Sequence, residues 1–599
     1  MRAYRARPPV ALLTAAALAW ALPAAAQTDK PLELVPPPGT PASSTMPQPL
    51  PAPAPAADAA SPAAAPPSDA GAPAAADTGI QVAPLEAVDT SWTGTLDPAA
   101  GGFPHDMWSG TQQSLVATAL PLLQPIASPA ALSLARRLLL SDAAAPSATA
   151  GAAGEPGLLA LRVDRLYALG LVNDGLALTQ RISAANATAE LLNRDRIELR
   201  AASGDFAAAC QDLADHVAQF QGLWWDRAGV ACAALTNDSA KASLGMSILN
   251  DEKAPPDPAF DAMVLRLTGR ASSKVALKVP SLPDPSPLRL AVLAAAKQPL
   301  PADALASAGP AALAGYAGND AVAPELRLAA AERAAQLGSL APDALGALYG
   351  RIDFKPAELD AAKKAVKPPA NSHQRALLFS LAHLAAEPAA REAAITALMA
   401  DARQRGALMA TAKLLAPTLD EIPATGADKG FAAVASRILL AAGRADAAQP
   451  WIDAAQDKAA EILARIAKPG VPQVDADLAR AALAGLNADD GAASHAADLL
   501  YSLLTGLGAD PAALGSLAMA APPRAGALPN AALWDAQLRA VQGKRLGETV
   551  LTTLLIAQSD GRLTQEPIVL KRAVEGLKAV GLDADAHALA LEAALEAGI

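Results

Sequence analysis

Apolar side chains recur at intervals of three and four residues through most of the chain, which places them on one face of an α-helix. Leu134 and Leu138 follow this pattern, and so do Leu377 and Leu381. Helix-length segments alternate with Gly, Asn-Asp or Asp-Pro breaks, and Ser, Asp or Pro stands at the expected helix starts. KVALKV at 274–279 is the one candidate for an extended segment, and prolines isolate it. We therefore predict an all-α protein.

The breaks recur at a regular spacing in one part of the chain. Gly170, Gly204 and Asn237 are 34 and 33 residues apart, and each lies between two helix-length segments. A small residue follows each break five positions later (Gly175, Ala209 and Ala242). Glycine lets a turn close, and a small residue lets paired helices approach each other. This spacing predicts consecutive helical hairpins over about 155–250.

The middle turn reads GDFAAA, from Gly204 through Asp205 and Phe206 to Ala209. This order of glycine, acidic residue, aromatic residue and alanine resembles the turn of a tetratricopeptide repeat. Two further turns share the spacing from glycine to alanine (Gly443 with Ala448, and Gly581 with Ala586). The resemblance implies an irregular α-solenoid of helical hairpins. The family's large aromatic residue early in the first helix of each pair is missing, so the repeats would be degenerate.

The N-terminal residues predict export. Residues 1–26 combine a basic start, an apolar run from Val10 to Leu22 and a small-residue site at Ala24 to Ala26, as in a cleaved signal peptide. Residues 27–84 are rich in Pro and Ala and hold almost no large apolar side chain, which predicts a disordered arm. The arm either spans part of the cell wall or is a neutral leader. The expected location is the periplasm, if the cell is Gram-negative.

The remaining chain divides by composition into four segments. Residues 85–114 are an irregular aromatic segment, and 115–254 form an N-terminal helical-hairpin array. Residues 255–321 are a Pro-rich connection with short helices, and 322–599 form a C-terminal array. The connection is either a domain boundary or a bend in one solenoid.

Composition and charge exclude some partners. The chain is 52% hydrophobic with a net charge of −11, and loss of three arginines with the signal peptide gives 45 − 59 = −14. An acidic chain with scattered Lys and Arg does not bind nucleic acid by neutralising phosphates. No later stretch is long and apolar enough to span a membrane, so we expect no integral membrane segment after signal cleavage.

Sequence motifs for catalysis are missing. The six histidines do not form an H-E-x-x-H motif, and the two cysteines do not form C-x-x-C. Neither G-x-S-x-G nor a phosphate-binding glycine-lysine loop occurs. We therefore expect no enzyme, no metal site and no cofactor. Some lytic transglycosylases carry a similar Ala-rich helical scaffold, but the C-terminus here continues the helices in place of a catalytic domain.

The cysteines lie at matching levels of one predicted hairpin. Cys210 and Cys232 are each eleven residues from position 221, inside the turn from Gln219 to Gly222. Residues equidistant from the turn of an antiparallel hairpin face each other, at about the 5.5 Å Cα separation of a disulfide. An exported protein with an even number of cysteines commonly oxidises them. The alternative is two buried free thiols that fill gaps between helices.

The sequence therefore predicts an exported, non-enzymatic scaffold or adaptor whose helical surface binds another envelope protein. Large aromatic residues are rare, and five are candidates for the interaction (Trp92, Phe103, Trp108, Trp224 and Trp225). The first three lie in the 85–114 segment, which is either a recognition loop or a cap that plugs the first helices. For Trp224 and Trp225 we expect one core residue and one groove residue. The alternatives are a peptidoglycan-binding scaffold, which the scarcity of aromatics disfavours, and a degenerate hydrolase.

Overall fold

A computed structural model describes residues 92–147, 157–181, 189–270, 279–486, 490–515, 517 and 528–599. The chain divides into two units, Met1–Pro84 and Leu85–Ile599, and the described residues all belong to the second. The predicted signal peptide (1–26) and arm (27–84) lie outside the described residues, as does KVALKV apart from Val279.

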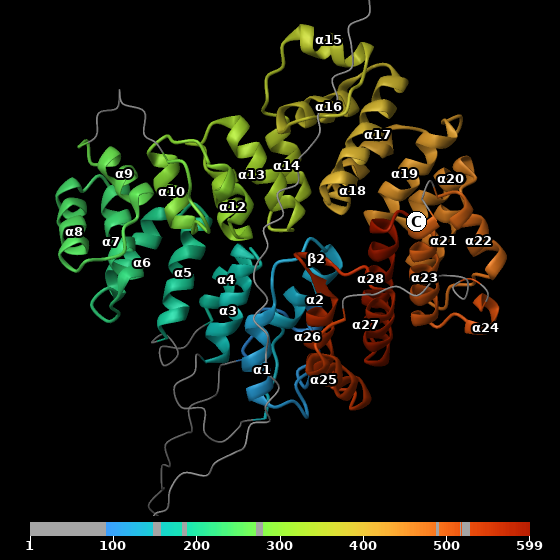
Figure 1. The fold of residues 1–599 in the computed structure, drawn as a ribbon, viewed down its shortest axis with the longest axis horizontal. Coiled ribbons are helices and arrows are strands. Elements are labelled where there is room, and N and C mark those ends of the chain that lie inside the picture. Colours follow the sequence, from blue (N-terminus) through green and yellow to red (C-terminus); the bar gives the residue numbers. More distant parts are fainter. Residues whose placement is uncertain are drawn as a thin grey trace, which may run out of the picture. The chain divides into compact units, whose positions relative to one another are not determined.

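The described part of the chain is predominantly helical, which confirms the predicted all-α fold (Figure 1). Its first helices are α1 (Gln113–Ala119), α2 (Pro129–Leu140), α3 (Leu158–Ala168), α4 (Val172–Thr179), α5 (Glu190–Ala202), α6 (Phe206–His216), α7 (Leu223–Leu235), α8 (Ser239–Asp251), α9 (Pro258–Leu267), α10 (Pro287–Ala295), α11 (Ala302–Ser307), α12 (Pro310–Gly318), α13 (Pro324–Gln336) and α14 (Pro342–Tyr349). The later helices are α15 (Pro356–Lys364), α16 (Ser372–Leu384), α17 (Pro388–Arg405), α18 (Leu408–Leu415), α19 (Lys429–Ala441), α20 (Ala445–Ala455), α21 (Lys458–Ala467), α22 (Ala476–Ala484), α23 (Asp490–Gly506), α24 (Pro511–Leu514), α25 (Ala531–Gln542), α26 (Leu546–Ala557), α27 (Pro567–Ala579) and α28 (Asp583–Glu596). Short 3₁₀ helices occur at Pro98–Ala100, Leu120–Leu122 and Ala416–Glu421.

Helices that follow each other in the chain pack as pairs, which confirms a solenoid of helical hairpins. The pairs include α5 with α6, α7 with α8, α12 with α13, α16 with α17, α19 with α20 and α27 with α28. Asp residues begin several of these helices: Asp205 caps α6 by accepting a hydrogen bond from the Ala208 amide (3.1 Å). Such caps satisfy backbone donors that have no partner inside the helix.

The turn residues chosen from the sequence lie between paired helices. Gly170, Gly204, Gly443 and Gly581 have φ values of +74°, +83°, +74° and +80°, the left-handed region that favours glycine. Asn237 takes the same role with φ +62°. The alanines that follow five positions later are fully buried (Ala209, Ala242, Ala448 and Ala586), and Phe206 is half-buried against the core. The small residues therefore lie where paired helices approach.

A β-hairpin interrupts the helices and was not predicted. Strand β1 (Gln558–Ser559) pairs antiparallel with β2 (Arg562–Leu563). Asp560 and Gly561 form the turn with φ values of +48° and +74°, as in the two-residue Asp-Gly turns that favour hairpins. In the sequence, the Asp-Gly pair indicates a hairpin turn, but the two strands are too short to show alternating hydrophobicity.

The described residues of the second unit form two hydrophobic cores. One core joins residues from the first helices to residues from α16 onwards, and α2 packs against both α26 and α28 (Figure 1). The other core includes Trp225, Met263, Leu313 and Leu345, so helices of the Pro-rich connection share a core with α7 and α14. The division into two arrays at 255–321 stays a prediction.

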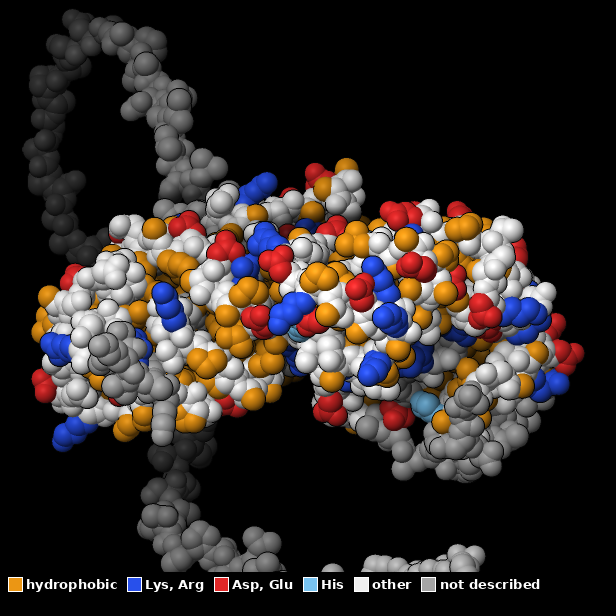
Figure 2. All heavy atoms as spheres, turned by 90° about the horizontal axis from the view of Figure 1, so that it is seen from above, with side chains coloured by type: hydrophobic (Ala, Val, Ile, Leu, Met, Phe, Trp, Pro, Cys, Tyr) orange, Lys and Arg blue, Asp and Glu red, His pale blue; other side chains and the backbone are white. Residues whose placement is uncertain are grey.

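Among the described residues, none of the helices has both the length and the apolar character that crossing a bilayer requires. On the face drawn in Figure 2, basic and acidic side chains are interspersed among apolar ones. This face therefore offers no extended area of a single charge.

Candidate functional site

The three candidate aromatics of the 85–114 segment lie in the core. Trp92, Phe103 and Trp108 are each 1% exposed, and the rings of Trp92 and Trp108 are 4.8 Å apart. Trp108 lies against Gly547 at the start of α26, where a Cβ atom would come within 2.7 Å of the indole. This burial contradicts the expectation that the three residues bind a partner, because almost none of their surface is accessible. The alternative of a cap that plugs the first helices fits the structure.

The tryptophan pair on α7 divides into one core residue and one cavity residue. Trp225 is buried and donates from Nε1 to Glu190 Oε1 (2.9 Å). Trp224 is half-buried, and its ring meets that of Trp225 edge to face with centroids 4.9 Å apart. This arrangement follows from the helix, because consecutive side chains point about 100° apart.

Trp224 lines a cavity of about 420 Å³ between α5, α7, α9 and the start of α10. Its apolar lining comes from Leu223, Trp224, Ala228, Ala231, Phe260 and Leu288, and its polar lining from Arg194, Glu198, Arg227, Asp257, Asp284, Ser286 and Arg289. We call this space the Trp224 cavity. Cavities of this volume bind small ligands or a few side chains of a partner.

Glu198 is a buried carboxyl group in the lining, with 2% of its surface exposed. It accepts hydrogen bonds from Trp224 Nε1 (3.3 Å) and from the Leu288 amide in the first turn of α10 (3.1 Å). Burial raises the pKa of Glu198, and these hydrogen bonds act in the opposite direction. Glu198 thus fixes the indole of Trp224 relative to α10.

Three arginines line the same cavity. The Arg194 guanidinium lies over the Trp224 ring, 5.2 Å from its centroid. Arg289 binds Asp257 at 2.7 Å, and Arg227 approaches the same carboxylate oxygen at 4.0 Å. Asp257 also caps α9 through the Phe260 amide (3.1 Å). With Glu198 and Asp284, the cavity presents both charge signs beside an apolar surface.

A disulfide joins α6 and α7 on the hairpin that carries Trp224. Cys210 and Cys232 are bonded with their Cα atoms 5.5 Å apart, the pairing that the hairpin geometry predicts. Cys232 directly follows Ala231 of the cavity lining. The bond therefore restrains the helix that supplies Trp224 and Arg227.

The cavity residues that sequence reasoning missed are the arginines and carboxyl groups. Arg194, Arg227 and Arg289 belong to three different helices and share no motif. The feature of the sequence that best indicated this cavity was Trp224, because large aromatic residues are rare in the chain and Trp225 stands beside it.

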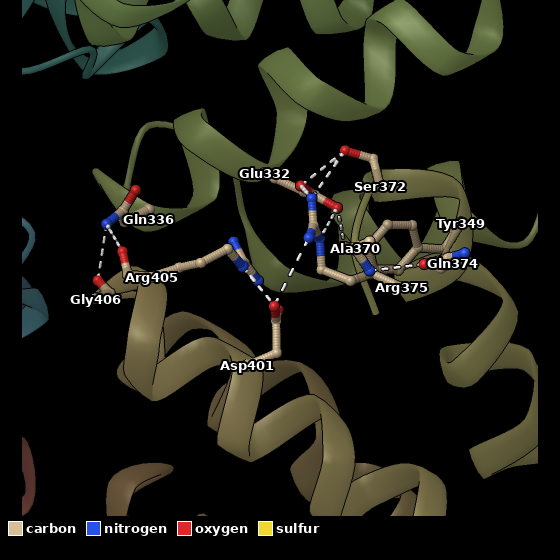
Figure 3. A network of polar contacts seen from close by, with 10 residues as sticks. All are labelled: Glu332, Gln336, Tyr349, Ala370, Ser372, Gln374, Arg375, Asp401, Arg405 and Gly406. Atoms are coloured by element: carbon tan, nitrogen blue, oxygen red, sulfur yellow. Dashed lines mark hydrogen bonds and ion pairs between the residues drawn. The ribbon is translucent and has the colours of Figure 1, made fainter. Parts of the chain in front are cut away.

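A second polar cluster lies between α13, α14, α16 and α17 (Figure 3). Arg375 forms two hydrogen bonds to the Glu332 carboxylate (2.8 and 2.7 Å), and Tyr349 and Ser372 donate to the same group (2.7 and 2.9 Å). Burial and the neighbouring Glu332 raise the pKa of Tyr349 well above its usual value. The space beside this cluster is about 20 Å³, room for about one water molecule. Its polar groups are engaged with one another, so we assign it to helix packing.

The described residues also form no group of three or more His, Cys, Asp or Glu that could hold a metal ion. The Trp224 cavity is therefore a site whose geometry supports binding through shape and charge. Comparison with known proteins finds no family model, no curated protein and no solved structure that matches this chain.

Proposed function

We propose that this protein is an exported, non-enzymatic scaffold or adaptor that binds a segment of another envelope protein in the Trp224 cavity. The main support for the proposal is the composition of the cavity. Trp224, held by Glu198, lies there beside three arginines and an apolar lining. Tryptophan and arginine dominate the binding energy of many protein interfaces. Helical solenoids use such surfaces to recognise extended segments.

The lining supports a polypeptide as the ligand. Leu223, Ala228 and Phe260 offer apolar contact to one or two side chains, whereas the guanidinium and carboxyl groups can pair with charges of either sign. The disulfide between Cys210 and Cys232 supports export, because such bonds persist mainly in oxidising compartments.

Peptidoglycan binding stays an alternative. Sugar rings stack on exposed aromatic faces, but Arg194 already lies over the Trp224 ring and Trp225 meets its edge. A degenerate hydrolase is the third candidate, and no constellation among the described residues favours it.

The test is capture of partners from envelope extract with the full mature chain and two matched variants. Trp224→Ala removes the indole on which Arg194 stacks. Trp534→Ala removes a similar stacking contact outside the cavity, in which Arg572 lies 4.4 Å from the ring centroid. We expect a specific protein to bind the wild type and Trp534→Ala but to be lost from Trp224→Ala. Equal capture by both variants would contradict the assignment of the cavity. Displacement of the captured protein by soluble peptidoglycan fragments would favour the alternative.

A fourth preparation lacks residues 27–84 and tests the arm separately. The deletion ends before the 85–114 segment because Trp92 and Trp108 belong to the core. Unchanged capture by this preparation places binding on the helical body.

A further inference from the structure

A second cavity, of about 240 Å³, lies between α17, α18, α19 and α28. Its lining is Thr396, Met399, Ala400, Arg403, Leu408, Val434, Arg437, Ala441 and Leu595. The lining residues on α17 are three, one and three positions apart, and those on α19 are three and four apart. Each helix therefore contributes one face to the cavity. We call this space the Arg403 cavity.

The walls of the Arg403 cavity are apolar. Met399, Leu408 and Leu595 are buried side chains of the main core, and Val434 packs against the same core. Protein interiors contain few voids larger than a water molecule. An engineered apolar cavity of about 150 Å³ stays dry and binds benzene. The Arg403 cavity has a larger volume and opens to solvent beside Thr396 and Ala400, which are exposed, so an alkyl chain can enter it and lie along its apolar walls.

Both charged side chains that line this cavity are arginines. Arg437 donates through Nη1 to Asp457 (2.6 Å) and to the Ala433 carbonyl (3.1 Å). Among the described residues, the guanidinium of Arg403 has no hydrogen-bond or ion-pair partner, although the charge of Glu596 acts on it. Arg403 is exposed at the mouth of the cavity, and partial desolvation of its guanidinium and the nearby charge of Arg437 lower its pKa. A bound anion would relieve this repulsion between like charges.

We propose that the Arg403 cavity binds a medium-chain carboxylic acid, with its alkyl chain against Met399, Leu408 and Val434 and its carboxylate at Arg403 and Arg437. Guanidinium groups match carboxylates through paired hydrogen bonds, which favours this head group over a cation or a neutral alcohol. The site is independent of the Trp224 cavity and of the function proposed for it.

The first test titrates the full mature chain with octanoate by calorimetry. We expect saturable binding of octanoate and at least tenfold weaker binding of octylammonium, which has the same chain and the opposite charge. Acetate, which has the head group without the chain, should not bind measurably. Failure of octanoate to bind, or equal binding of octylammonium, would overturn the proposal.

Two variants locate the binding. Arg403→Met keeps a long side chain without its charge and should weaken octanoate binding about tenfold, the order expected for a charged hydrogen bond. Ala400→Phe places a ring in the cavity from an exposed position and should weaken binding while the melting temperature stays unchanged. Arg480→Met on α22, an exposed arginine outside the cavity, is the matched control. Octanoate affinity unchanged in both cavity variants would place the ligand elsewhere and refute the site.

Discussion

Glu592 lies in α28 with 1% of its surface exposed, and its carboxylate accepts a hydrogen bond from the Ala130 amide at the start of α2 (3.0 Å). Burial raises its pKa from 4.5 to about 7, while hydrogen bonds from Ser128 and Ala130 and the charge of Lys413 lower it. Between pH 4.5 and about 7, the Glu592 carboxyl group is protonated in the folded protein and ionised in the unfolded chain. Stability therefore decreases as the pH rises through this window.

Glu592→Gln is expected to remove this contribution. The amide keeps an acceptor for Ala130 but carries no charge, so the variant should melt at a higher temperature than the wild type at pH 8. The raised pKa of Glu592 corresponds to a difference in unfolding free energy of roughly 3 kcal/mol, since one pKa unit is about 1.4 kcal/mol. The advantage should disappear at pH 4. Parallel melting profiles of the two proteins from pH 4 to 8 would contradict the prediction.

Ala209 tests the close approach of paired helices. It is fully buried in α6, so Ala209→Leu inserts a larger side chain into a filled space and should cost roughly 1–3 kcal/mol. Ala207→Leu, at an exposed position of the same helix, is the control and should change stability by less than about 0.5 kcal/mol. Urea unfolding followed by circular dichroism measures both, and equal effects would show that Ala209 is not a packing position.

At the level of elements, the disulfide restrains the hairpin of α6 and α7. Cys210 and Cys232 are separated by 22 positions, and closure of such a loop should contribute roughly 3 kcal/mol on the loop-entropy model. We expect reduction to lower the unfolding free energy by about this amount. Non-reducing peptide mapping of denatured protein isolated from the cells that produce it should find one linked peptide. Two alkylatable thiols would show that the bond does not form in the cell.

The Glu332 carboxylate links α13, α14 and α16, and Arg375 extends the cluster to Asp401 of α17 at 3.8 Å. Glu332→Gln removes the charge that pairs with the buried Arg375 at 2.7 Å and leaves Asp401, at 3.8 Å, as its counter-ion, which should cost up to about 3 kcal/mol. Glu325→Gln, at an exposed position of the same helix, should have almost no effect. Thermal unfolding of both variants decides whether the cluster stabilises the helix packing.

The elements and the contacts within a hairpin, such as the Cys210–Cys232 bond, could be predicted from local signals, whereas contacts between helices far apart in the chain could not. Gly204 and Ala209 identify a turn and a close approach because backbone conformation and side-chain size act locally. The burial of Trp108 depends on Gly547, which no pattern near the tryptophan reveals. The Trp224 cavity depends in the same way on Arg194 and Arg289, from helices that only tertiary packing brings together.

At the scale of the whole molecule, the chain should behave as a resistant helical body with a susceptible N-terminal arm. Limited proteolysis is expected to remove residues 27 to about 80 quickly and to leave a body of roughly 500 residues, because few side chains in the arm can bury apolar surface. Mass spectrometry of the digest over time measures this. Persistence of the intact chain would contradict the predicted disorder.

The contact of α2 with α26 and α28 also has a consequence for how the protein is made. Arg137 binds Asp585, 448 positions later, at 2.7 Å, and Ala130 binds Glu592, 462 positions later. Helix α2 therefore leaves the ribosome long before α26 and α28, which cover it, are synthesised. Contacts between residues so far apart in the chain slow folding. Until they form, the partly folded chain exposes apolar surface. The first helices to be synthesised are thus among the last to be buried.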